Sequence, residues 1–96
     1  RNARREDGAA IHALVERSGT LEPNTAYCYV LMADHFASTT LVAESAEREL
    51  VGAVVGYRPP SRPDALFVWQ VGVDPSARGA GLGLELLRAF ARSAAG

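Results

Sequence analysis

Two segments near the N-terminus carry apolar residues three and four positions apart, which is the spacing of one helical face. The first segment predicts a helix over residues 8–17, and Asp7 just before it is a residue type that favours the N-cap position. The second segment predicts a helix over residues 26–35. We expect the buried face of this second helix to carry Tyr27, Val30 and Leu31.

Three apolar runs in the middle of the chain predict β-strands over residues 41–44, 50–57 and 66–73. The polar stretch between the first two runs favours a hairpin. The third run is almost continuously apolar, so we expect it to be a central strand that is covered on both faces. The proline-rich residues 58–64 predict an exposed, stiff connection. A further short strand is expected near residues 3–5.

The last segment predicts an amphipathic helix that begins near Leu82. Its apolar stripe consists of Leu82, Leu86, Phe90 and Ala94, supported by Leu87 and Ala91. The order helix, helix, strand, strand, strand, helix predicts an α+β fold, and nothing indicates a boundary within residues 1–96. We therefore expect a single domain. A helix in this position should return to another strand, so the sheet would be completed by strands after Gly96 or by another chain.

Composition narrows the class of protein. Hydrophobic residues make up 48% of the 96 residues and charged residues 22%, which is typical of a globular domain. The net charge of -1 gives no reason to expect nucleic acid or an anionic membrane as a partner. No apolar run approaches the roughly 18 residues of a membrane span. A single cysteine, Cys28, excludes an internal disulfide, fits a reducing cytoplasm and predicts no cysteine-built metal site.

The most specific chemistry lies between the third strand and the last helix. There Arg78 is followed by three glycines, Gly79, Gly81 and Gly83. Glycine permits positive φ and lets an anion approach the backbone, and the first N–H groups of a helix lack internal partners. This turn therefore predicts a site for an anion such as a pyrophosphate. A P-loop is excluded because the sequence has no lysine, and a Rossmann fingerprint is excluded because Leu84 stands where glycine is needed.

The pattern Arg78-x-x-Gly81-x-Gly83, between a strand and a helix, resembles the acyl-CoA-binding motif of the GCN5-related N-acetyltransferases. The resemblance implies the GNAT fold, truncated after the acetyl-CoA-binding loop and helix, with acetyl-CoA as cosubstrate. It also implies that the pantetheine arm runs beside the third strand, where the backbone N–H of Val71 would stabilise the oxyanion. The implied cofactor-binding residues are Val71, Gly72, Val73, Arg78, Gly79, Ala80, Gly81, Leu82 and Gly83.

Upstream segments are similar to one branch of that family, the L-2,4-diaminobutyrate acetyltransferases of ectoine biosynthesis. The resemblance rests chiefly on residues 7–11, 18–21, 56–60 and 67–75 and reaches only the N-terminal part of those enzymes. It implies that the γ-amine of a small diamine, diaminobutyrate, attacks the thioester directly in a ternary complex. The implied substrate-binding residues are Glu22, Asn24, Tyr27 and Trp69.

Several of these residues have a second interpretation. Glu22, acting through water, is the candidate general base, because no carboxylate lies on the third strand. Trp69 could hold an ammonium group by cation–π contact or could simply fill the core, and Tyr27 could be a helix–core contact. Alternation along a strand predicts that Gln70 faces away from Trp69. His12 is expected to be an ordinary surface or capping residue.

Two further functional interpretations stay open. The same fold and cosubstrate could serve another small amine or diamine, or the chain could be a non-catalytic acyl-CoA-binding fragment. For the enzyme we expect a small-molecule substrate, no metal, no nucleic acid and no membrane. We also expect a homodimer in the cytoplasm.

Overall fold

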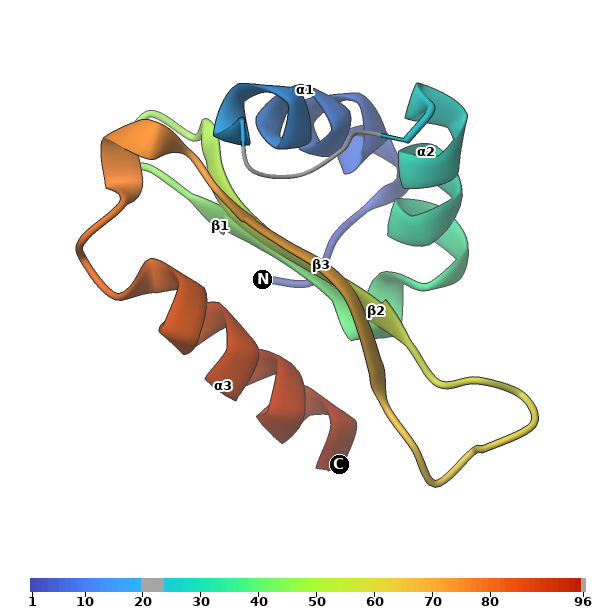
Figure 1. The fold of residues 1–96 in the computed structure, drawn as a ribbon. Coiled ribbons are helices and arrows are strands. Elements are labelled where there is room, and N and C mark those ends of the chain that lie inside the picture. The colour runs from blue at the N-terminus through green and yellow to red at the C-terminus, as the bar shows by residue number, and fades with distance from the viewer. Residues whose placement is uncertain (20–23, 96) are drawn as a thin grey trace.

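The computed structural model describes residues 1–19 and 24–95 and arranges them as an antiparallel sheet with helices on both faces (Figure 1). The helices α1 and α2 cover one face, and α3 covers the other. Each predicted helix forms, and so do the three strands expected from the middle of the chain, with the expected boundaries met to within one residue. The elements, with η for a short 3₁₀ helix, are η1 (Arg5–Asp7), α1 (Gly8–Ser18), α2 (Ala26–His35), η2 (Ala37–Thr39), β1 (Thr40–Glu44), β2 (Leu50–Tyr57), β3 (Phe67–Val73), η3 (Pro75–Ala77) and α3 (Leu82–Ala95).

The three strands lie in the order β1-β2-β3, and both neighbouring pairs are antiparallel. The central strand is therefore β2, and β3 forms an edge of the described sheet. The prediction that the third apolar run is the central strand is wrong for this sheet. An apolar run carries no information about hydrogen-bonded neighbours. The expected cover on both faces is also incomplete, because Phe67 and Val68 are exposed.

A β-bulge interrupts the pairing of β2 with β3. Val55 pairs with Gln70, whereas the next residue of β2, Gly56, pairs with Val68. Trp69 is thus an extra residue without a cross-strand partner. A bulge of this kind bends the strand and breaks the alternation of side chains between the two faces.

Two apolar clusters hold the helices to the sheet. Beneath α1 and α2 the fully or almost fully buried side chains include Ile11, Leu14, Val15, Tyr29, Ala33, Val42, Ala53 and Val55. Beneath α3 the buried side chains are Leu41, Val54, Leu86 and Phe90. Leu86 and Phe90 confirm the predicted stripe of α3, but Leu87 and Ala91 are exposed and do not support it. The side chain of Ala94 lies outside the described part of the molecule.

The buried face of α2 differs from the predicted one. Tyr29, Met32 and Ala33 are buried, whereas Tyr27 is 70% exposed. Both sets have helical spacing, and the stretch is so apolar that the period alone does not select a face. Tertiary packing makes the selection, and α1 approaches the backbone of α2 closely at Gly8.

The N-terminus begins differently from the expected strand. Only Asn2 bridges to Leu41, and residues 5–7 form the 3₁₀ helix η1. Asp7 stands at the N-cap position of α1 but makes no cap hydrogen bond there. Its carboxylate instead accepts a hydrogen bond from the Arg4 N–H at 2.7 Å, so it stabilises the turn that precedes α1. No helix within residues 1–19 and 24–95 is long and apolar enough to cross a membrane.

The contact between α1 and α2 depends on Gly8. A Cβ atom at Gly8 would lie 2.6 Å from the Cα atom of Val30, and backbone cannot yield as a flexible side chain does. By contrast, a Cβ atom at Gly83 in α3 would lie 3.7 Å from Val73 Cγ2, which is an ordinary contact.

We expect Gly8→Ala to lower the free energy of unfolding of the full-length protein by about 1–3 kcal/mol, because the added methyl group overpacks the α1–α2 contact. Gly83→Ala is the matched control and should stabilise α3 by about 0.5–1 kcal/mol. Denaturant unfolding of both variants without ligand measures the difference. Equal stability of the two variants would contradict the packing of α1 against α2.

Candidate functional site

The glycine turn lies between η3 and α3. Gly79 and Gly81 have φ values of 89° and 78°, a backbone conformation that residues with a side chain rarely adopt. A Cβ atom at either position would meet nothing within 4 Å. The turn therefore requires glycine for its backbone conformation and leaves its outer side open. Gly83 belongs to α3 and does not have a positive φ, so this position does not use the positive φ that glycine permits.

Two arginines tie this turn to the end of α1. Arg17 donates from Nε to Asp74 Oδ2 at 2.8 Å and from Nη2 to the Leu50 carbonyl at 3.2 Å. In the opposite direction, Arg78 Nη2 donates to the carbonyl oxygen of Ser18. Arg78 was expected to contact an anion in the turn. In the structure its Nη2 satisfies a carbonyl at the C-terminus of α1, where helices leave such groups without internal partners, and the anion contact stays a prediction.

Asp74 lies between the end of β3 and the glycine turn, just before η3. Its Oδ1 accepts hydrogen bonds from the Ser76 hydroxyl at 2.7 Å and the Ser76 N–H at 2.9 Å, which caps η3. The Ser76 hydroxyl, the Ser76 N–H and the Arg17 guanidinium together lower the pKa of Asp74 to about 2. Asp74 is therefore charged throughout the neutral range.

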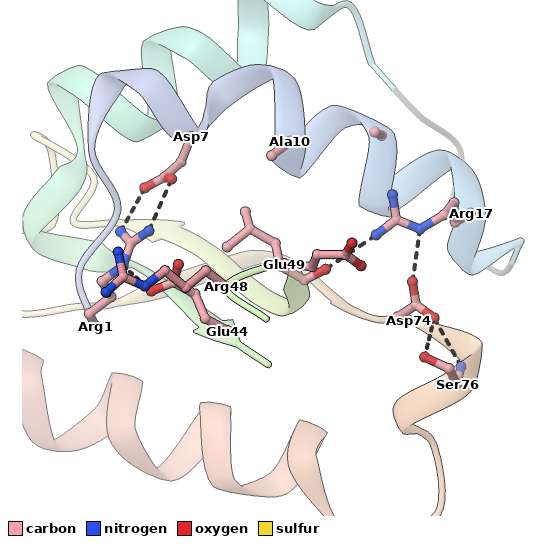
Figure 2. A pocket seen from close by; sticks show the side chains of 11 residues that line it. Arg1, Asp7, Ala10, Arg17, Glu44, Arg48, Glu49, Asp74 and Ser76 are labelled. Carbon is pink, nitrogen blue, oxygen red and sulfur yellow. Dashed lines mark hydrogen bonds and ion pairs between the residues drawn. The ribbon is translucent and has the colours of Figure 1, made fainter. Parts of the chain in front are cut away.

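A surface cleft of about 680 Å³ lies beside these residues, between α1 and the β1–β2 hairpin (Figure 2). At its other end Arg1 binds Asp7 at 2.9 Å and Glu44 at 2.7 Å. Partial burial raises the pKa of Asp7, but the hydrogen bonds from Arg1 and from the Arg4 N–H outweigh this effect and lower it. The cleft includes neither Trp69 nor the glycines. Arg1 is paired with Asp7 and Glu44, and Arg17 with Asp74, which indicates a structural role for these charges.

The edge of β3 exposes backbone groups next to the turn. Asp74 donates its N–H to the Val51 carbonyl at 2.8 Å, so these two residues form a hydrogen-bonded pair. Such pairs alternate with non-hydrogen-bonded pairs along an antiparallel ladder. Val73 and Val71 lie one and three residues before Asp74 in regular register. Their N–H and C=O groups therefore face away from β2, along the open edge of the described sheet.

Tyr29 connects three of the residues near the bulge. Its ring stacks on Trp69 with centroids 5.7 Å apart and an interplanar angle of 27°. Its hydroxyl donates to Gln70 Oε1 at 2.9 Å and accepts the Asn24 N–H at 3.0 Å. The expectation that Gln70 faces away from Trp69 is wrong, because the bulge places both side chains on the Tyr29 side of the sheet.

The predicted acceptor residues are only partly brought together. Asn24 and the half-buried Trp69 are linked through Tyr29, while Tyr27 is exposed and makes no helix–core contact. Glu22 lies outside the described residues. Tyr29 was not identified from the sequence. Its spacing to Met32 and Ala33 fits one helical face as well as the spacing of Tyr27, Val30 and Leu31 does.

Two other side chains, His12 and Cys28, are half-buried. The His12 ring packs on Tyr29 at 5.5 Å, so it is a half-buried neighbour of the core and not an ordinary surface residue. Burial raises the pKa of the half-buried Cys28 thiol. Within the described ranges no group of three or more His, Cys, Asp or Glu side chains could hold a metal ion.

Comparison with known proteins assigns the chain to a family. The family model described as acetyltransferase (GNAT) matches residues 9–96. The chain belongs to the GNAT acetyltransferase family. The fold inferred from the glycine turn and the order of elements is thereby confirmed.

Relatives within this GNAT family have names that indicate one substrate. The L-2,4-diaminobutyric acid acetyltransferase of Methylotuvimicrobium alcaliphilum is 49% identical over 85 residues, which are 88% of this chain and 49% of that protein. The protein of the same name from Vibrio cholerae is 47% identical over 88 residues, or 92% of this chain and 50% of that protein. This GNAT chain thus spans about half the length of the curated relatives it matches.

Solved GNAT structures give the same picture. One is diaminobutyrate acetyltransferase EctA from Paenibacillus lautus, in complex with L-2,4-diaminobutyric acid and coenzyme A. It is 37% identical, with a TM-score of 0.90, and the match covers 94% of this chain and 54% of the EctA chain. The GNAT-like decarboxylase GphF, in complex with isobutyryl-CoA, is 22% identical with a TM-score of 0.84, covers 97% of this chain and 57% of its own, and shows the fold alone.

Because the folded-state pKa of Asp74 lies below its ordinary value, its ionisation stabilises the native state above pH 4, and this contribution is lost as the pH falls through about 2. We therefore expect the melting temperature of the wild type to fall more steeply between pH 5 and pH 2 than that of Asp74→Asn. Thermal unfolding across this range measures both slopes.

Asp64→Asn, on the exposed proline-rich connection, is the matched control for loss of one carboxylate and should follow the wild type. An Asp74→Asn profile parallel to that of the wild type would show that the Arg17 and Ser76 contacts do not couple to stability.

Proposed function

We propose that the full-length protein transfers the acetyl group of acetyl-CoA to the γ-amine of L-2,4-diaminobutyrate, a step of ectoine biosynthesis. The main support is the similarity to the diaminobutyrate acetyltransferase solved with this substrate and coenzyme A, at 37% identity and a TM-score of 0.90. Two relatives with the same named activity, at 49% and 47% identity, add to it. Fold alone would not suffice, because a GNAT-like decarboxylase shares it.

The glycine turn supports the cosubstrate half of this proposal. Its backbone leaves Gly79 and Gly81 open on their outer side, directly before the N-terminus of α3. An acyl-CoA carries a pyrophosphate, and such a group is stabilised by unpaired N–H groups and by the positive end of a helix. We assign pyrophosphate binding to the residues from Arg78 to Gly83, with Ala80 and Leu82 contributing their backbone N–H groups.

The edge of β3 supports the position of the thioester. The N–H groups of Val71 and Val73 face away from β2, so an extended pantetheine arm can pair with them and with the backbone on either side of Gly72. The N–H of Val71 would then donate to the carbonyl oxygen of the thioester, where negative charge develops as the amine attacks.

For the acceptor we propose Glu22, Asn24, Tyr27 and Trp69 as contacts. The attacking γ-amine must lose its proton, and Glu22 acting through water is the proposed base. The new C–N bond forms as the C–S bond breaks, and the coenzyme leaves as a thiolate that takes up a proton. The π-face of Trp69 suits the remaining ammonium group. The homodimer and the cytoplasmic location remain predictions.

The acceptor assignment is tested by thiol release from acetyl-CoA with a panel of amines. We expect kcat/KM for L-2,4-diaminobutyrate to exceed that for ornithine by about tenfold or more, because one added methylene in a fitted pocket costs that much. Lysine and polyamines, which are longer still, should react more slowly. Equal rates across the panel would favour the alternative, a GNAT enzyme for another small amine.

The cosubstrate assignment is tested by Gly81→Val. A β-branched residue at a φ of 78° strains the turn and covers its open side. A strain of about 1–3 kcal/mol corresponds to a rise of about ten- to hundredfold in the Kd for acetyl-CoA. Calorimetry measures this Kd, and Leu84→Ala, at an exposed position in the first turn of α3, is the control that should bind normally. Unaltered affinity of Gly81→Val would refute the assignment.

A further inference from the structure

Tyr29 is the most heavily used side chain near the bulge, and the proposed reaction gives it no role. It is fully buried, so it cannot itself touch a substrate. It nevertheless contacts two proposed acceptor residues, the Asn24 backbone through its hydroxyl and Trp69 through its ring. Its hydroxyl also donates to Gln70, the residue after Trp69.

We propose that Tyr29 is a positioning residue that fixes Asn24 and Trp69 relative to each other and so sets the affinity for the amine acceptor. The inference rests on the proposed function, which makes these two residues acceptor contacts. Through Tyr29, Asn24 just before α2 is joined to Trp69 and Gln70 at the bulge of β3.

The bulge explains why such a support is needed. Trp69 has no cross-strand partner in the ladder, so the pairing of β2 with β3 does not hold its backbone as it holds Gln70 or Val68. The stack on Tyr29 fixes the plane of its ring, and the hydrogen bond to Gln70 fixes the adjacent residue. Two contacts from one rigid, buried ring leave Trp69 little freedom to rotate.

The other end of the connection is the start of α2. Thr25 caps this helix by accepting the Cys28 N–H at 3.3 Å, and Asn24 lies just before the cap. The Asn24 N–H points at the Tyr29 hydroxyl, one helical turn later. Since the hydroxyl both accepts from Asn24 and donates to Gln70, it serves as a bridge and not merely as a filler.

A core-filling role and a positioning role make different demands. Core filling needs the ring, and positioning needs the hydroxyl as well. Tyr29→Phe keeps the ring and removes the hydroxyl. In the full-length protein we expect this variant to raise the KM for the amine acceptor about tenfold, because the Asn24 N–H loses its buried acceptor and the segment shifts. The KM for acetyl-CoA and kcat should change less than about twofold.

Tyr57→Phe is the matched control. Tyr57 is a half-buried tyrosine on this face of the sheet, where it contacts Phe36 and Phe67 at the far end of β2. Its variant should leave both KM values unchanged. A purely structural loss would reduce the amount of folded enzyme, which lowers the apparent kcat and moves neither KM. Hydrogen exchange of the Asn24 amide should be faster in Tyr29→Phe.

The outcomes separate the inference from the proposed function. If the wild type acetylates another amine better than diaminobutyrate, the acceptor assignment fails, and the comparison is made with that amine. A raised acceptor KM with an unchanged acetyl-CoA KM supports the positioning role. Equal changes in both KM values, or a change in neither, overturn it even when the wild type is active. A wild type that acetylates no amine overturns both.

Discussion

The geometry of the candidate site depends on the extra residue that β3 carries opposite the step from Val55 to Gly56. In a regular strand Trp69 and Gln70 would face opposite sides of the sheet, and the bulge turns both toward Tyr29. Gly56 makes room for it. A Cβ atom there would lie 2.6 Å from the Phe67 carbonyl oxygen and 2.4 Å from Phe90 Cζ. This close packing of β3 and α3 against β2 therefore requires glycine at position 56.

The glycine turn of the proposed site is joined to the end of α1. Arg17 reaches Asp74 and the Leu50 carbonyl, and Arg78 reaches back to the Ser18 carbonyl. These contacts also have a geometric consequence. They hold the glycine turn against the C-terminal end of α1. A turn that binds an anion by backbone N–H groups needs such support, because its own glycines supply no side-chain contacts.

Local patterns predicted most of the elements because each needs only a period and suitable ends. The helices and strands follow from apolar spacing, and the conformations of Gly79 and Gly81 follow from their residue type. The failures have a common cause. The central position of β2, the rotation of α2 that buries Tyr29 in place of Tyr27, and the shared face of Trp69 and Gln70 all depend on how separate segments meet. The hydrophobic pattern does not show how many neighbours a strand has in the sheet, and it does not show a one-residue bulge.

The sequence by itself determined the kind of molecule. Its periodicity specified the α+β order of elements, and the resemblance of Arg78 and the following glycines to a family motif indicated the GNAT family. These are local properties, because backbone conformation and helix N–H groups depend on neighbouring residues. Only the tertiary structure decided that Tyr29 binds Asn24, Trp69 and Gln70 together and that Arg78 contacts Ser18. Those contacts join residues as many as 60 positions apart, and their geometry exists only once both faces of the sheet are packed.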